Sequence, residues 1–120
     1  MAGTIDFGNE TSWECSGGTF RDMVAGVTSF LSDSTASLRV SDVLSRAIAS
    51  GLMFVQYDRV FDAQMGLEFL AALQEYLVSP VTLDKENALN PTLHDGYIAM
   101  LRRLCELVRK FEESRRKQGG

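Results

Sequence analysis

The sequence predicts a mainly α-helical fold, a small four-helix bundle with a short N-terminal β-hairpin. Four segments carry apolar residues at the three- and four-residue spacing of one helical face, and one short segment alternates apolar and polar residues. The chain of 120 residues fits one domain, and contents of 45% apolar and 23% charged residues are typical of a globular protein. We therefore treat residues 1–120 as a single domain.

The hairpin is expected over residues 4–15, around a turn signal at Gly8-Asn9. The apolar residues that alternate with polar neighbours are Ile5, Phe7, Trp13 and Cys15. The first helix is expected next, over residues 19–32, with Thr19 as its N-cap and Asp22 as the acid of a capping box. Its apolar face comprises Phe20, Met23, Val24, Val27, Phe30 and Leu31.

The second helix is expected over residues 41–57, with Ser41 as its N-cap. Its inward residues would be Val43, Leu44, Ala47, Ile48, Gly51, Leu52 and Val55. Residues 52–57 are apolar on every side, which fits either a buried final helical turn or a short strand. Length and continuity with the preceding pattern favour the helix.

The third helix, over residues 61–78, carries the clearest apolar arc. The arc comprises Met65, Phe69, Leu70, Leu73, Tyr76 and Leu77, and Gln64, Glu68, Ala71 and Glu75 lie opposite it. Gly66 sits within the arc, where the missing side chain would let another helix approach closely. After a polar loop over residues 79–90, Asn90 and Pro91 open a last helix over residues 91–116, with Leu104 near the centre of its apolar arc.

The residue inventory argues against an enzyme. The chain has two cysteines and one histidine, so we expect no metal and no cofactor. His94 and Cys105 would lie roughly 16 Å apart along one helix, too far for a catalytic pair. The turn at residues 16–19 lacks the lysine and the spacing of a phosphate-binding loop. An enzyme with an unrecognised pair of carboxylates remains the alternative.

The charge is distributed unevenly. Residues 1–100 hold thirteen acidic and five basic residues, a net charge of −8, whereas residues 101–120 hold three acidic and seven basic residues, a net of +4. The acidic part repels nucleic acid and anionic lipid and favours a basic partner. The alternative is that this charge serves solubility alone. No apolar run reaches the roughly 18 residues of a membrane span, so we expect no membrane partner.

The basic C-terminal segment is largely neutralised by acids at helical spacing, such as Glu106 and Lys110. An unbroken basic patch is left only at residues 115–117, and it contains no aromatic residue for base stacking. This argues against a nucleic-acid partner, although a nucleic-acid-linked regulator that uses this basic end remains an alternative.

Acidic side chains outside this segment form two candidate binding patches. The first comprises Asp62, Gln64, Glu68 and Glu75, on a stretch without Lys or Arg between residues 60 and 84, and an ordinary solvated helix face is its alternative explanation. The second comprises Glu10 and Glu14 on the hairpin. We predict that these residues contact a basic protein.

The predicted function is that of a small, acidic, non-enzymatic protein-binding module. Within that class we favour an inhibitor or immunity-type protein that neutralises a basic effector or toxin, by analogy of class rather than by any motif. A secretion chaperone or an adaptor subunit has the same traits, and a homodimer would use the same exposed apolar residues. The first 15 residues lack the pattern of a secretory signal, which predicts a cytoplasmic protein, although a mature secreted chain would look the same.

Overall fold

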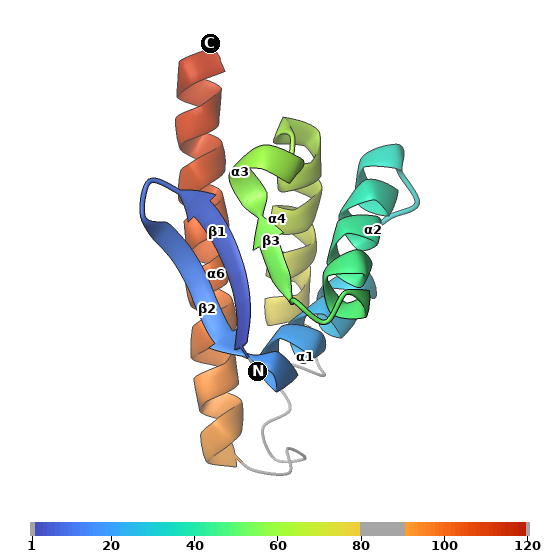
Figure 1. Ribbon diagram of the computed structural model, residues 1–120, viewed down its shortest axis with the longest axis vertical. Coiled ribbons are helices and arrows are strands. Elements are labelled where there is room, and N and C mark those ends of the chain that lie inside the picture. Colours follow the sequence, from blue (N-terminus) through green and yellow to red (C-terminus); the bar gives the residue numbers. More distant parts are fainter. Residues whose placement is uncertain (1, 80–90, 120) are drawn as a thin grey trace.

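The computed structural model describes residues 2–79 and 91–119, and it confirms a mainly helical fold, with 69% helix and a small N-terminal sheet. Three strands are described: β1 (Ala2–Gly8), β2 (Thr11–Ser16) and β3 (Phe54–Gln56). The helices are α1 (Gly17–Thr28), α2 (Thr35–Ala49), α3 (Tyr57–Val60), α4 (Ala63–Leu77) and α6 (Pro91–Gly119). Figure 1 shows α6 as the longest element, with its C-terminal end projecting past the other helices.

The sheet has the strand order β2-β1-β3. β1 and β2 pair antiparallel, with Ile5 opposite Trp13, as the hairpin prediction requires. The connecting turn is built on positive φ angles at Gly8, Asn9 and Glu10, of 81°, 50° and 63°. β1 also pairs in parallel with β3, where Ile5 faces Val55. The expected two-stranded hairpin is therefore part of a three-stranded mixed sheet.

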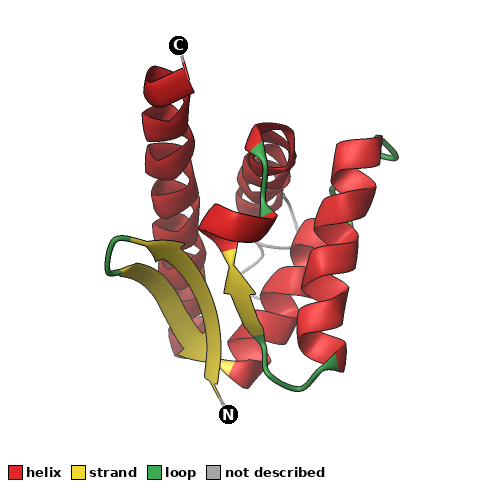
Figure 2. Cartoon of the chain, turned by 45° about the horizontal axis from the view of Figure 1, so that its top comes forward, coloured by secondary structure: helices red, strands yellow, loops and turns green. Residues whose placement is uncertain are grey.

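One face of this sheet packs on the helices, as Figure 2 shows. Its buried side chains are those of Ile5, Phe7, Trp13 and Val55. The indole Nε1 of Trp13 donates a hydrogen bond of 2.8 Å to the backbone carbonyl of Met100 in α6. This bond satisfies the polar atom of a fully buried ring, so the hairpin is joined to α6 by a directional contact as well as by packing.

The first two helices both begin earlier than the sequence predicted. The N-cap of α1 is Ser16, whose hydroxyl accepts from the backbone N–H of Thr19, so Thr19 lies inside the helix and is not its cap. The N-cap of α2 is Ser34, whose hydroxyl accepts from the backbone N–H of Ser37, so the predicted start at Ser41 is wrong by almost two turns. In both cases an earlier serine satisfies the free N–H groups of the first turn. α1 also ends at Thr28, before the predicted Ser32.

Residues 52–57 do not continue α2, and this prediction was wrong. Gly51 and Met53 have φ angles of 78° and 48°, which lie in the left-handed region and end the helical path. The chain then forms β3, and around this strand Met53, Val55 and Tyr57 are buried, whereas Leu52 and Phe54 are exposed. Pairing with β1 satisfies the backbone groups along one side of β3, which stabilises a strand only three residues long.

The helix predicted over residues 61–78 corresponds to α4, with slightly narrower bounds, and the short helix α3 precedes it outside that range. α3 is a single turn, and α4 starts after Asp62, whose carboxylate accepts from the backbone N–H of Met65 as an N-cap. Gly66 allows the close approach that the sequence predicted, because a Cβ there would overlap the Glu112 carboxylate of α6. The last helix extends beyond the predicted range of 91–116, as far as Gly119. The predicted loop at 79–90, apart from Ser79, and the predicted Asn90 cap lie outside the described residues.

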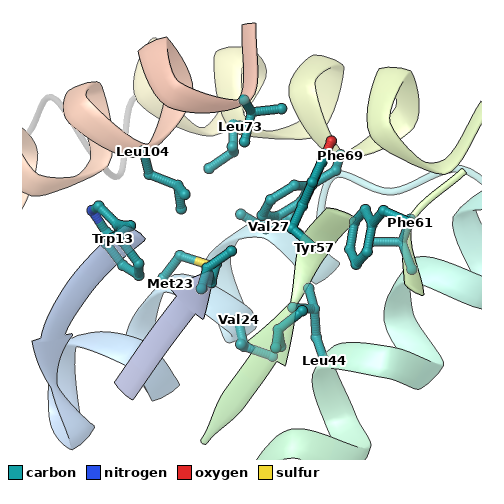
Figure 3. Close-up of a cluster of buried hydrophobic side chains, with 14 of the residues drawn as sticks. Trp13, Met23, Val24, Val27, Leu44, Tyr57, Phe61, Phe69, Leu73 and Leu104 are labelled. Atoms are coloured by element: carbon teal, nitrogen blue, oxygen red, sulfur yellow. The ribbon is translucent and has the colours of Figure 1, made fainter. Parts of the chain in front are cut away.

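The core lies between the sheet and the helices. Leu73 of α4 and Leu104 of α6 are fully buried, as predicted from the centres of their apolar arcs. Figure 3 shows both side chains near Trp13 and Met23, with the ring of Tyr57 beside Phe61 and Phe69. Tyr57 stacks on Phe61 with 4.5 Å between ring centroids and meets Phe111 of α6 edge-on at 5.2 Å. This aromatic cluster fixes α3 against α4 and α6, next to the site described below.

Candidate functional site

A groove of about 690 Å³ runs between α4 and the C-terminal half of α6. The two helices are antiparallel, since Gly66 lies against Glu112 and the hydroxyls of Tyr76 and Tyr97 lie 2.7 Å apart. The residues that line the groove are Ala63, Leu67, Leu70 and Gln74 from α4, and Arg109, Glu112, Glu113, Arg115 and Arg116 from α6. The volume is in the range of sites that hold small ligands or a short segment of another protein.

The α4 wall of the groove is a stripe at helical spacing. Ala63, Leu67, Leu70 and Gln74 follow one another at intervals of four, three and four residues, so they share one face. The neighbouring face of α4 carries Met65, Phe69 and Leu73 into the core, which directs the stripe outward. Leu67 is 58% exposed, so the stripe presents a large apolar side chain to the open groove.

The α6 wall is charged and ordered by contacts along the helix. Arg109 forms an ion pair of 2.9 Å with Glu113, one turn further on. The guanidinium carbon of Arg115 lies 4.8 Å from the centre of the Phe111 ring, in a cation–π contact. Arg116 is exposed at the rim of the groove. The guanidinium groups therefore stand beside an apolar stripe on the facing helix.

Glu112 reaches the groove from a buried position, with only 7% of its surface exposed. The hydroxyl of Tyr57 donates a hydrogen bond of 2.6 Å to its Oε2, and Nε of Arg115 lies 3.5 Å from its Oε1. Burial raises the pKa of Glu112 above its usual value of 4.5, although the Tyr57 hydrogen bond and the Arg115 charge oppose this. Burial and the neighbouring carboxylate also raise the pKa of Tyr57, so its hydroxyl keeps its proton.

The predicted patch around α4 is only partly free. Asp62 caps α4 and forms an ion pair of 3.0 Å with Arg39 of α2; the N–H of Met65 and the charge of Arg39 lower its carboxyl pKa. Gln64 and Glu75 are exposed, as expected.

Glu68 departs from the expected solvent-facing stripe. Its two carboxylate oxygens accept hydrogen bonds from the hydroxyls of Ser34, at 3.4 Å, and Ser37, at 3.1 Å. Ser37 is fully buried, so this carboxylate joins α4 to the first turn of α2. A negative charge is favourable at that helix end. Glu68 therefore has partners within the chain, which its place opposite the apolar arc did not indicate.

The hairpin patch is a separate surface. Glu10 and Glu14 are both exposed, the first in the turn and the second on β2. In Figure 1 the hairpin turn lies to one side of α6 and α4 lies to the other, so the structure does not bring the two predicted acidic patches together.

Sequence reasoning missed Leu67 and Glu112 of the groove lining, and also Tyr57, which does not line the groove but bonds to Glu112. A signal for Glu112 exists, because it continues the spacing of the buried residues Leu104 and Val108 by another four positions. A carboxylate on the apolar arc of a helix indicates a buried acid with a specific partner. Tyr57 carried no such signal, because it contacts Glu112 across 55 positions of sequence.

Three further observations bear on function. Within residues 2–79 and 91–119, no three His, Cys, Asp or Glu side chains gather in a way that could hold a metal ion. No helix in this part of the chain combines the length and apolar character needed to cross a membrane. On α6 the basic residues Arg102, Arg103, Arg109 and Lys110 are exposed, and the expected pair of Glu106 and Lys110 is present at 3.0 Å.

Compared with protein-family models, curated proteins and solved structures, the chain gives no significant match to any of the three.

Proposed function

We propose that this chain is a small, non-enzymatic protein-binding module that receives an apolar helical face of its partner in the groove between α4 and α6. The observation that carries this proposal is Leu67, a leucine with 58% of its surface exposed on the wall of a concave groove. Burial of a leucine side chain contributes about 1.5–3 kcal/mol, so a partner that covers the stripe gains binding energy there. A groove between two helices is a common receptor for an amphipathic helix.

The state of Glu112 supports binding rather than catalysis. A general acid or base needs a proton site free to exchange with substrate. In this groove Oε2 of Glu112 already accepts from Tyr57, and Oε1 is paired with Arg115. The carboxylate therefore has a structural role, which is to join α3, α4 and α6 beneath the groove.

A selection of helical peptides displayed on phage tests the proposal. The wild-type protein should enrich peptides whose binding is lost in a Leu67→Glu variant and retained in a Leu38→Glu variant. Leu38 is the matched control, because it is also an exposed leucine on a helix, at 60%, and lies outside the groove lining. If the enriched peptides bind all three proteins equally, or none is enriched, the groove is not a protein-binding site.

An inhibitor or immunity-type protein that neutralises a basic effector is a second candidate. It is favoured by the exposed side chains of Gln64 and Glu75 on α4 and of Glu10 and Glu14 on the hairpin. If a neighbouring gene encodes a basic effector, the two proteins should co-purify, and higher salt should weaken the complex. Glu75→Lys, or Glu10→Lys with Glu14→Lys, should slow association. An unchanged association rate in both variants would exclude this candidate.

A further inference from the structure

We infer that the groove between α4 and α6 selects an acidic amphipathic helix, whose apolar stripe covers Leu67 and Leu70 and whose acidic residues lie along one flank only. This inference rests on the proposed function, because it names the chemistry of the partner that the same groove receives.

The two walls of the groove differ in charge. The lining residues of α4 are all uncharged, whereas α6 contributes three arginines and two glutamates, a net charge of +1. Glu112 is buried and bonded to Tyr57, and Glu113 is paired with Arg109, so both carboxylates already have partners. A guanidinium has five N–H donors, so Arg109 keeps donors for a further acceptor after its bond to Glu113. The α6 flank therefore favours carboxylates on the incoming helix, and the α4 flank favours uncharged residues.

The spacing of these groups sets a pattern for the partner. Arg109 and Arg116 are seven residues apart on one helix face, which separates them by about 10.5 Å along the axis. Leu67 and Leu70 lie about one turn apart on the facing wall. A bound helix therefore matches the groove with acids seven residues apart on one flank and apolar residues three or four positions from each acid.

The distribution of charge along the chain also favours an acidic helix at this groove. Residues 1–100 carry a net charge of −8 and residues 101–120 a net of +4. Glu68 and Glu75 of α4 lie outside the groove lining. An acidic helix is therefore attracted to the C-terminal half of α6 and repelled from the remainder, which orients it toward the groove.

Three synthetic peptides of about 18 residues, or five helical turns, test the inference. They share one leucine stripe and carry Glu, Gln or Lys at the flank positions. We expect the Glu peptide to bind about fivefold to tenfold more tightly than the Gln peptide, since two exposed ion pairs contribute this much, and the Lys peptide to bind least. Raising the salt from about 0.05 M to about 0.5 M should remove most of the difference.

Two variants locate the effect. Arg109→Gln with Arg116→Gln should abolish the preference for the Glu peptide, whereas Arg103→Gln should preserve it. Arg103 is the matched control, because it is an exposed arginine of α6 outside the groove lining. Leu67→Glu should weaken the binding of all three peptides.

Each contrary result has one meaning. If the Gln or Lys peptide binds as tightly as the Glu peptide and still depends on Leu67, the acidic preference is wrong and the binding module stands. If no peptide shows a dependence on Leu67, both proposals are wrong. If sedimentation shows a wild-type dimer that Leu67→Glu dissociates, a second copy fills the groove and the acidic partner is excluded.

Discussion

The hydroxyl of Tyr57 lies 2.6 Å from Oε2 of Glu112, and both atoms lie too close to Gly66 for a Cβ to fit at that position. One hydrogen bond thus joins the short helix α3 to α6, and the absence of a side chain at Gly66 lets α4 close over it. The carboxylate is largely removed from water and is held by the neutral Tyr57 hydroxyl and the Arg115 guanidinium, and the removal from water is costly for its charged form.

The stability of the protein should fall as the pH rises through the titration of Glu112. The unfolded carboxyl releases its proton near pH 4.5, whereas burial raises the pKa of the folded carboxyl above that value. In the interval between the two values the folded state binds more protons than the unfolded state, so the free energy of unfolding decreases as pH rises. Glu112→Gln keeps an acceptor for Tyr57 and should remove this part of the pH dependence.

Urea unfolding between about pH 4 and about pH 8 measures the effect as the difference between the wild type and Glu112→Gln. Glu113→Gln controls for the change in net charge, because Glu113 is the adjacent residue and its side chain is 45% exposed. Identical pH slopes for the wild type and Glu112→Gln would show that burial does not disfavour the charged carboxylate.

Gly66→Ala should destabilise the protein by about 1–3 kcal/mol, because its Cβ overlaps the Glu112 carboxylate and lies 2.6 Å from the Tyr57 hydroxyl. The cost should shrink in a Glu112→Ala background, which removes the overlapping atoms, and a double-mutant cycle measures the coupling. Gly96→Ala is the control. A Cβ at position 96 meets nothing within 4 Å, so the better helix propensity of alanine should stabilise the protein by about 0.5–1 kcal/mol. Equal effects at the two glycines would contradict the packing described for Gly66.

Leu73→Ala and Leu104→Ala should each lower the free energy of unfolding by about 2–5 kcal/mol, because both side chains are fully buried and leave a cavity. Leu38→Ala should cost less than about 0.5 kcal/mol, because that leucine is 60% exposed. Denaturant titrations of the three variants test the assignment of the core faces. Losses at Leu73 and Leu104 no larger than at Leu38 would mean that these faces are misplaced.

The helical faces and the hairpin could be predicted from the sequence because their apolar residues follow a single period. The strand within residues 52–57 could not be predicted, because apolar residues occupy both phases of this segment and hide the alternation. Met53 and Val55 are buried, but Leu52 and Phe54 are exposed. The caps were uncertain for a related reason. More than one serine or threonine stands near the start of α1 and of α2, and the choice of Ser34 depends on its contacts with Ser37 and with Glu68 of α4.

The candidate site was less accessible to sequence reasoning. The exposure of Gln64 and Glu75 follows from helical periodicity alone, and the structure agrees. The groove depends on which side of α4 is left uncovered by α6, and periodicity places Leu70 on the buried arc without saying that its edge borders an open groove. Glu68 illustrates the same limit, because an outward position on one helix becomes an internal position where a second helix covers it.

Glu68→Lys should destabilise the protein by about 1–3 kcal/mol, whereas Glu75→Lys should stay within about 0.5 kcal/mol of the wild type. The Glu68 carboxylate accepts from Ser34 and from the fully buried Ser37, whereas Glu75 is exposed. Glu68→Lys removes the acceptor for both serine hydroxyls and places a positive charge at the N-terminus of α2, which the helix dipole disfavours. Glu68→Gln, which keeps an acceptor oxygen, should fall between the two. Thermal and urea unfolding of the three variants measure the difference, and equal stability for Glu68→Lys and Glu75→Lys would show that the contact between α4 and α2 contributes nothing.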